Sequence, residues 1–248
     1  MKFFVMLGIL SSIAFSLTHL EVAQKSEAVM SGFKDSVAEM KMELINAAGE
    51  TKSREMKMMV LEGKEDKSLM EFKTPSDVKG TKFLSYEHID KEDDQWLYLP
   101  ALKRVKRIAS KAKSGAFMGS EFAYEDLSGT NVEKYNYTQA EAPTIDMNGV
   151  LVYKSIASPR SKDSGYTKLV SYIDIKTFLV KKIEYFDRKN EILKVAYFDN
   201  YRAYDGVYRA SQITMKNLQN GKSTRLIWSS EKIKNGLKES DFHQRHLK

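Results

Sequence analysis

The sequence predicts a mainly β protein with one antiparallel sheet curled into an open or half-closed barrel. Many short stretches alternate apolar and charged residues, as half-buried strands do, because successive side chains point to opposite faces. Turn residues separate these stretches at spacings of about 8–15 residues, which allows only antiparallel neighbours. A sheet of roughly a dozen such strands normally curls or closes. We expect one helix near the N-terminus and one near residue 120.

Residues 1–16 have the pattern of a cleaved signal peptide. Lys2 precedes an apolar run over 3–15, and Ala14 and Ser16 supply the small residues that precede a cleavage site. The run is shorter than the roughly 20 residues of a membrane-spanning helix, although a short N-terminal anchor is the alternative. No cysteine follows it, so the chain is not itself a lipoprotein. We therefore expect a periplasmic protein, with residues 17–248 forming a single domain.

Composition narrows the function classes. The 248-residue chain contains no cysteine, which excludes disulfides, thiolate metal sites and a cysteine nucleophile. Its net charge of +7 favours anionic partners such as lipid headgroups, or is simply a solvated basic surface. Because the protein is expected to be exported, we expect no nucleic-acid partner.

The elements follow in order. Apolar residues at mixed spacings of three, four and seven, among them Val22, Phe33 and Val37, predict an amphipathic helix over about 21–37. A break over 110–129 suggests a loop leading into a short helix, with Ser120 as its N-cap and Gly129 as its stop. The dipeptide Asn220-Gly221 between two alternating runs is a strong hairpin signal. The predicted strands cover 40–44, 56–60, 69–73, 81–89, 95–99, 103–108, 132–139, 151–157, 167–175, 178–187, 192–201, 207–216 and 223–229.

Two blocks of the sequence point to a family. The first is the run from Gln95 to Ile108, which reads Gln-Trp-Leu-Tyr-Leu-Pro-Ala-Leu-Lys-Arg-Val-Lys-Arg-Ile; the second spans 117–127 and ends in Tyr-Glu-Asp-Leu. With the strand at 181–185 and the tail at 242–245, they resemble the outer-membrane lipoprotein-sorting protein family, a LolA-like group of exported proteins. The similarity extends from about residue 25 to the C-terminus.

The resemblance implies a LolA/LolB-like half-open antiparallel β-barrel of about eleven strands with one or two helices on its concave side. It also implies a hydrophobic cavity for acyl chains and an RND-type (MMPL-like) inner-membrane exporter as a partner. We further expect an outer-membrane acceptor, no cofactor and no metal. We expect a monomer. No residue of this chain matches the lid arginine of the better-known carrier.

Apolar side chains in three regions are the candidates for lining that cavity. Methionine suits a surface that adapts to variable apolar cargo, and ordinary core packing is the alternative for the methionine-rich region. The predicted lipid-binding residues are Met40, Met42, Leu44, Met56, Met58, Val60, Met70, Phe72, Trp96, Leu97, Leu99, Phe117, Met118 and Phe122.

Four cations near the predicted hairpin at 95–108 are candidates for headgroup or partner contact. They are Lys103, Arg104, Lys106 and Arg107. Cations beside an apolar opening can hold phosphate groups while the tails enter. The alternative is a solvated sheet edge whose charges discourage aggregation.

The segment 115–127 is either a movable plug, given its glycines and its apolar Phe117, Met118 and Phe122, or a fixed cover on the sheet. Its carboxylates Glu125 and Asp126 most simply cap a helix or pair with cations. We find no catalytic or metal-binding motif, and four histidines are too few for a convincing metal cluster.

The sequence thus predicts a non-enzymatic periplasmic carrier that holds lipid or lipoprotein acyl chains and transfers them toward the outer membrane. One alternative is an adaptor of an RND-type exporter that binds protein and no lipid. Another is an enzyme acting on envelope glycolipid.

Overall fold

The computed structural model describes residues 16–129 and 131–248, so the expected signal peptide lies outside the described residues except for Ser16. Its 14-stranded sheet has more strands than the expected eleven. The strands are β1 (Asp35–Ile45), β2 (Thr51–Leu61), β3 (Lys67–Thr74), β4 (Lys82–Tyr86), β5 (Asp94–Leu99), β6 (Arg104–Arg107), β7 (Tyr135–Tyr137), β8 (Thr144–Met147), β9 (Val150–Pro159), β10 (Tyr166–Asp174), β11 (Val180–Asp187), β12 (Ile192–Tyr204), β13 (Val207–Asn217) and β14 (Ser223–Ile233).

The helices are few and short. The α-helix α1 covers His19–Met30. Seven 3-10 turns complete the described elements: η1 (Pro100–Leu102), η2 (Ser110–Ala112), η3 (Phe117–Gly119), η4 (Tyr124–Leu127), η5 (Val132–Lys134), η6 (Glu239–Phe242) and η7 (Gln244–Leu247).

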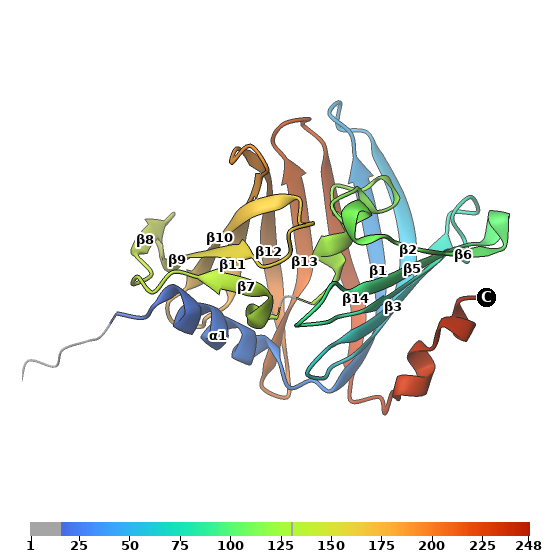
Figure 1. Cartoon of the computed structure of the whole chain (residues 1–248), viewed down its shortest axis with the longest axis horizontal. Coiled ribbons are helices and arrows are strands. Elements are labelled where there is room, and N and C mark those ends of the chain that lie inside the picture. Colours follow the sequence, from blue (N-terminus) through green and yellow to red (C-terminus); the bar gives the residue numbers. More distant parts are fainter. Residues whose placement is uncertain (1–15, 130) are drawn as a thin grey trace, which may run out of the picture.

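The sheet is open and antiparallel, as predicted. Its order is β6-β5-β4-β3-β2-β1-β14-β13-β12-β11-β10-β9-β7, with β8 paired to β9. Strands β1–β6 therefore form one half of the sheet and β7–β14 form the other. The two halves join where β14 pairs with β1. Figure 1 shows the sheet curling around α1 and around the green segment that enters its concave side.

The alternation in the sequence fixes which side chains face inward. Met40 lies opposite Met56 across the β1–β2 pair, and Met58 lies opposite Met70 across β2–β3. These methionines share the concave face because residues two apart in a strand point the same way. The intervening lysines and glutamates face outward.

The N-terminal helix begins as predicted but ends earlier. Thr18 caps it, with its Oγ1 accepting from the Glu21 backbone N–H and the Glu21 carboxylate accepting from the Thr18 N–H at 2.8 Å. The helix ends at Met30 rather than near residue 37. Gly32 has φ of +101°, a conformation that a helix cannot contain, and Asp35 already begins β1.

The helix expected near residue 120 is absent from the described residues, where two single 3-10 turns, η3 and η4, stand instead. Ser120 caps no helix: it follows η3, its N–H donates to the Phe117 carbonyl, and its hydroxyl accepts from the Phe122 N–H at 3.2 Å within a local turn. Ala123, inside the predicted helix, is extended and forms an antiparallel bridge with Ala116, so helical backbone begins only at Tyr124. We call residues 109–129, which cross the concave side, the plug segment.

The C-terminal segment covers part of the other face of the sheet (Figure 1). Phe242 and Leu247 are fully buried there against Leu84 and Trp96. The Tyr86 hydroxyl donates to the Phe242 carbonyl at 2.6 Å and fixes the segment in place.

Candidate functional site

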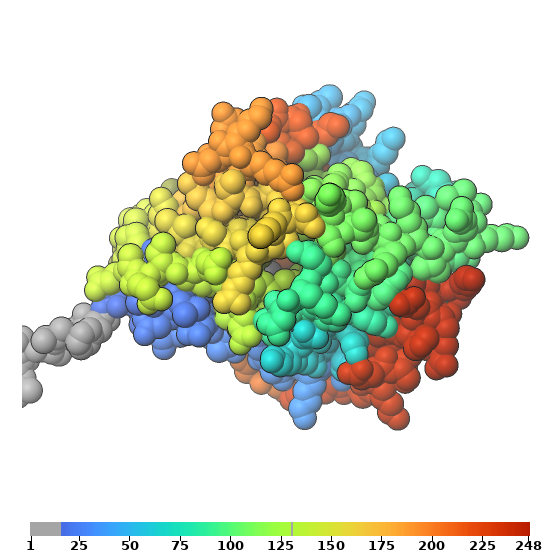
Figure 2. Space-filling view, viewed as in Figure 1, coloured from blue at the N-terminus to red at the C-terminus, as the bar shows by residue number. Residues whose placement is uncertain are grey.

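A cavity of about 1330 Å³ lies within the curl of the sheet. Both halves of the sheet, α1 and the plug segment contribute to its walls, and it is larger than the roughly 300–1,000 Å³ of most small-molecule sites. Figure 2 shows the surface hollowed between the yellow segment near residue 160 and the teal segment near residue 90. The protein's own side chains thus leave this space unfilled.

One wall of the cavity is apolar. It is built mainly by inward-facing side chains of β2 and of β10–β14: Met58, Val60, Leu169, Ile173, Val180, Ile183, Phe198, Ile213 and Trp228. Ala157, Ser171 and Ala210 line the same space. Since these three side chains are too small to reach across the curl, the packing that normally fills a protein interior is missing here.

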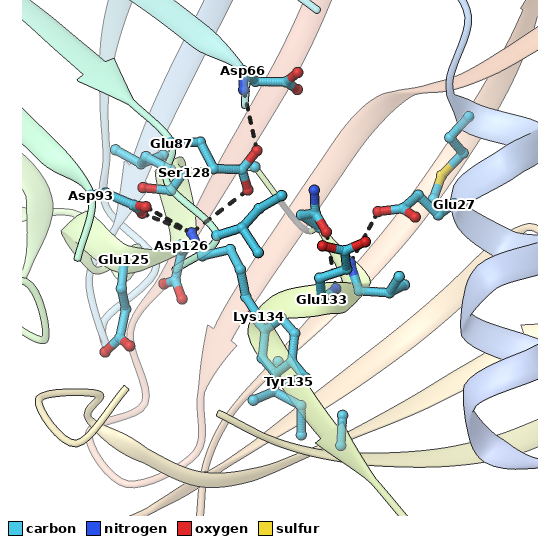
Figure 3. A pocket seen from close by; sticks show the side chains of 18 of the residues that line it. Glu27, Asp66, Glu87, Asp93, Glu125, Asp126, Ser128, Glu133, Lys134 and Tyr135 are labelled. Atoms are coloured by element: carbon cyan, nitrogen blue, oxygen red, sulfur yellow. Dashed lines mark hydrogen bonds and ion pairs between the residues drawn. The ribbon is translucent and has the colours of Figure 1, made fainter. Parts of the chain in front are cut away.

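The opposite wall is acidic (Figure 3). Asp66 precedes β3 and Glu87 follows β4, so the two lie side by side at the open end of this strand pair, where the Asp66 N–H donates to Glu87 Oε2 at 3.3 Å. Glu27 reaches in from α1, and its Oε1 accepts from the Val132 N–H at 3.0 Å. Lys134 Nζ donates to both oxygens of Asp93, at 2.8 and 3.0 Å. The cavity therefore has one apolar wall and one charged wall.

Burial shifts the acidity of this wall. Desolvation, with smaller contributions from Glu87 and Glu62, raises the pKa of Asp66 to about 6. Desolvation also raises the pKa of Glu27, and the neighbouring Glu87 and Glu133 act in the same direction. Both carboxyl groups are partly buried, and neither forms an ion pair with a described residue.

A buried polar network holds the plug segment against the sheet. Asp126 accepts from Lys194 Nζ at 2.5 Å and from the Tyr166 hydroxyl at 2.8 Å, and both members of the ion pair are at most 4% exposed. Lys194 also donates to the Glu121 carbonyl at 2.9 Å. Glu125 accepts from the Ser164 hydroxyl at 2.7 Å, and burial raises its pKa. These contacts favour a fixed cover over a movable plug. Asp126 pairs with a cation as expected, whereas Glu125 accepts from a hydroxyl and a backbone N–H instead.

The structure places the predicted lipid-binding residues in three environments. Met58 and Val60 line the cavity. A second group fills the core where the plug segment packs on β1–β5, fully or partly buried: Met40, Met42, Leu44, Met56, Met70, Phe72, Leu97, Leu99, Phe117, Met118 and Phe122. Phe117 is fully buried, with its ring 5.1 Å from that of Phe83 and 6.0 Å from that of Phe72. These side chains occupy the space that the sequence analysis assigned to cargo.

Trp96 lies on the other face of the sheet from Leu97. Its ring is 5.0 Å from that of Tyr86, in the cluster that the C-terminal segment covers. Consecutive residues of a strand point to opposite faces, so Trp96 and Leu97 cannot line one cavity together.

The four predicted headgroup contacts lie around the edge strand β6, away from the cavity lining. Lys103 follows η1, and Arg104, Lys106 and Arg107 are exposed on β6. Arg107 pairs with Asp94. Within the described chain, this placement fits an edge protected by charge.

The sequence analysis missed most of the cavity wall. The apolar contributors of β10–β13 were predicted only as strand residues, because alternation does not distinguish a filled interior from an empty one. Glu27, Asp66 and Glu87 had no signal at all, since charged residues in a helix or beside a turn are ordinarily solvated. The signal that was available is the occurrence of Ala157, Ser171 and Ala210 in strands, where bulkier residues predominate.

Comparisons with known proteins assign the family. A crystal structure of an outer-membrane lipoprotein-sorting protein domain from Vibrio parahaemolyticus is 46% identical, with a TM-score of 0.87 over 92% of this chain and 97% of that one. This chain belongs to the outer-membrane lipoprotein-sorting protein family. A family model described as "-like: Uncharacterized protein" also matches residues 64–248 of this chain. The search of curated proteins finds no match.

Two further crystal structures resemble this chain. A DUF1329 family protein from Desulfovibrio piger is 27% identical, with a TM-score of 0.86 over 93% of this chain and 98% of that one. A LolA superfamily protein from Nitrosomonas europaea is 16% identical, with a TM-score of 0.76 over 93% of this chain and all of that one, which supports the LolA-like fold. In the described residues, no helix has the length and apolar character needed to cross a membrane.

Proposed function

We propose that this chain is a periplasmic carrier that binds lipid or lipoprotein acyl chains in its cavity and transfers them toward the outer membrane. The observation that carries the proposal is the apolar wall around Met58, Ile213 and Trp228, which faces about 1330 Å³ of unfilled space. Membership of the lipoprotein-sorting family supports it.

The energetics suit binding without chemistry. Each methylene removed from water contributes about 0.8 kcal/mol, so a C16 chain gains on the order of 10 kcal/mol before ordering costs. That is enough to shield an acyl chain during transfer between membranes. The carrier alone does not determine the direction of transfer. We propose that an RND-type exporter donates the cargo and that an outer-membrane acceptor receives it.

Native mass spectrometry of the gently purified protein tests the proposal. We expect co-purified lipid, or uptake of an added C16 lysolipid, in the wild-type chain. Ser171→Phe narrows the cavity from β10 and should weaken uptake, while Ser53→Phe, on the exposed outer side of β2, should leave it unchanged. A wild-type protein that stays empty under both conditions contradicts the carrier function.

A further inference from the structure

The cavity lining is mainly acidic, although the chain as a whole is basic. The whole chain carries a net charge of +7. The residues that line the cavity nevertheless include eleven aspartates or glutamates and only seven lysines or arginines. Carboxylates are therefore in excess around the space in which the proposed cargo would lie, although the protein as a whole is basic.

Some of these carboxylates are neutralised by groups of the protein itself. Asp93 pairs with Lys134, and Asp126 pairs with Lys194. Glu62 accepts from the backbone N–H groups of Gly32 and Lys34, both at 2.7 Å. These groups are structural and need no ligand.

Glu27 and Asp66 are different. Each accepts one backbone hydrogen bond, Glu27 from Val132 and Asp66 from Gly63, both at 3.0 Å. Neither carboxylate forms an ion pair with any residue that the structure describes. Desolvation is the main cause of the raised pKa of both groups, and the charge of Glu87 raises both further.

Glu87 completes this acidic wall, and it is the carboxylate with a buried oxygen atom that lacks a hydrogen bond. The residue is only 4% exposed, and its Oε1 atom has no hydrogen-bond partner among the described residues. Its ion-pair contact, Lys134 Nζ, is 3.6 Å away and already donates to both oxygens of Asp93. Figure 3 shows Glu87 between Asp66 and Lys134. A buried carboxylate oxygen without a donor is costly unless a ligand supplies one.

The local strand pairing makes this arrangement unfavourable without a ligand. Lys67 of β3 lies opposite Tyr86 of β4, which brings Asp66 beside Glu87 in the next position. Like charges at neighbouring positions across a strand pair are destabilising. Ser26 Oγ of α1, beside Glu27 in the chain, also lines the cavity and is buried without a hydrogen-bond partner in the described part of the chain.

We infer that Glu27, Asp66 and Glu87 receive a primary ammonium group at the polar end of the acyl-chain cargo. This inference rests on the proposed function. An ammonium offers three N–H donors, and each of the three carboxylates accepts only one hydrogen bond from the described residues. Charge-assisted bonds of this kind are the strong ones. The cavity therefore selects amine-bearing lipids over lipids with only anionic headgroups, although the basic outer surface alone would suggest the opposite.

Competition binding on the full-length mature protein tests the inference. A fluorescent acyl-chain reporter is displaced by C16 lysophosphatidylethanolamine or C16 lysophosphatidylglycerol below their micelle concentrations. Both probes carry a phosphate, so the difference between them reports the ammonium. A second pair, hexadecylamine and hexadecanoate, removes the phosphate altogether. We expect the amine probe of each pair to bind about tenfold more tightly.

Glu87→Gln and Asp66→Asn should each reduce this preference severalfold without weakening displacement by the anionic probe. Glu191→Gln, which makes the same charge change on an exposed turn outside the cavity lining, should keep it. Thermal unfolding of each variant confirms that it is folded, and either variant alone suffices for the test.

The possible results separate the two ideas. Equal binding of amine and anionic probes, a preference for the anionic ones, or an unchanged preference in folded Glu87→Gln and Asp66→Asn would overturn the ammonium site while leaving the carrier intact. Failure of all four probes to displace the reporter, or of the reporter to bind, would overturn the proposed function itself.

Discussion

The curled sheet is filled along one part and empty along another, although the same strand alternation builds both. Beneath β1–β5, the plug segment inserts Phe117 among Phe72 and Phe83 and completes a dense core. Beneath β9–β13, small side chains such as Ala157 and Ala210 leave a cavity. The two parts differ in what packs against the sheet: an aromatic plug in one and open space in the other. The filled part therefore contributes stability, and the empty part is available for binding.

The largest expected effect contrasts the same substitution in the two parts. Phe117→Ala removes a fully buried ring from the filled part and should lower the free energy of unfolding by about 3–5 kcal/mol. Phe198→Ala, at the cavity wall, removes a partly buried ring that already borders empty space and should cost roughly 1 kcal/mol. Urea unfolding measures both, and equal losses would break the comparison.

The next effect tests how the plug segment is held. Lys194→Met leaves the buried Asp126 carboxylate without its cation and should cost about 3 kcal/mol, since removing one member of a buried pair strands the other. Lys182→Met, which breaks the more exposed pair with Glu184, should cost no more than about 1 kcal/mol. Chemical denaturation compares the two; a Lys194 variant as stable as the Lys182 variant would show that the pair does not anchor the plug.

A smaller effect comes from the acidic wall. The folded-state pKa of Asp66 is raised from 3.8 to about 6, so the stability that its protonated form contributes is present below pH 3.8 and is lost as the pH rises through 6. Each unit of that difference corresponds to about 1.4 kcal/mol. Asp66→Asn should therefore gain stability relative to wild type between pH 4 and pH 7, as measured by urea unfolding at a series of pH values.

The neighbours of Asp66 sharpen this measurement. Glu87 and Glu62 raise its pKa and Arg209 lowers it, so Glu87→Gln should bring the midpoint closer to the ordinary value. A constant stability difference between wild type and Asp66→Asn over the whole pH range would mean that Asp66 is solvated and that its pKa is not raised.

The sequence was sufficient for the architecture and insufficient for the cavity, for identifiable reasons. Alternation located the strands, and Asn220-Gly221 correctly marked the turn between β13 and β14. The short strand β8 was missed because its four residues carry little periodicity. The second helix was wrongly predicted because Ser120 resembles an N-cap locally, whereas the extended backbone of Ala123 and its bridge to Ala116 are not visible in the local pattern.

The cavity depends on distances between segments far apart in the chain. Alternation placed Met42 and Met58 on the same concave face, but only the position of the plug segment determines that Met42 is core and Met58 is wall. Glu87 is acidic and adjoins a turn, so nothing in its surroundings in the sequence distinguishes a buried carboxylate from a solvated one.

The two tryptophans of the chain give the most direct test of the central claim that the cavity holds acyl chains, because Trp228 lines it and Trp96 lies on the opposite face of the sheet. A fatty acid brominated along its chain quenches the fluorescence only of a tryptophan that it touches. We expect Trp96→Phe, which retains Trp228, to lose most of its emission as the brominated lipid is added, and Trp228→Phe to keep its emission. Quenching of Trp96 alone, equal quenching of both, or quenching of neither would contradict an acyl chain lying in this cavity.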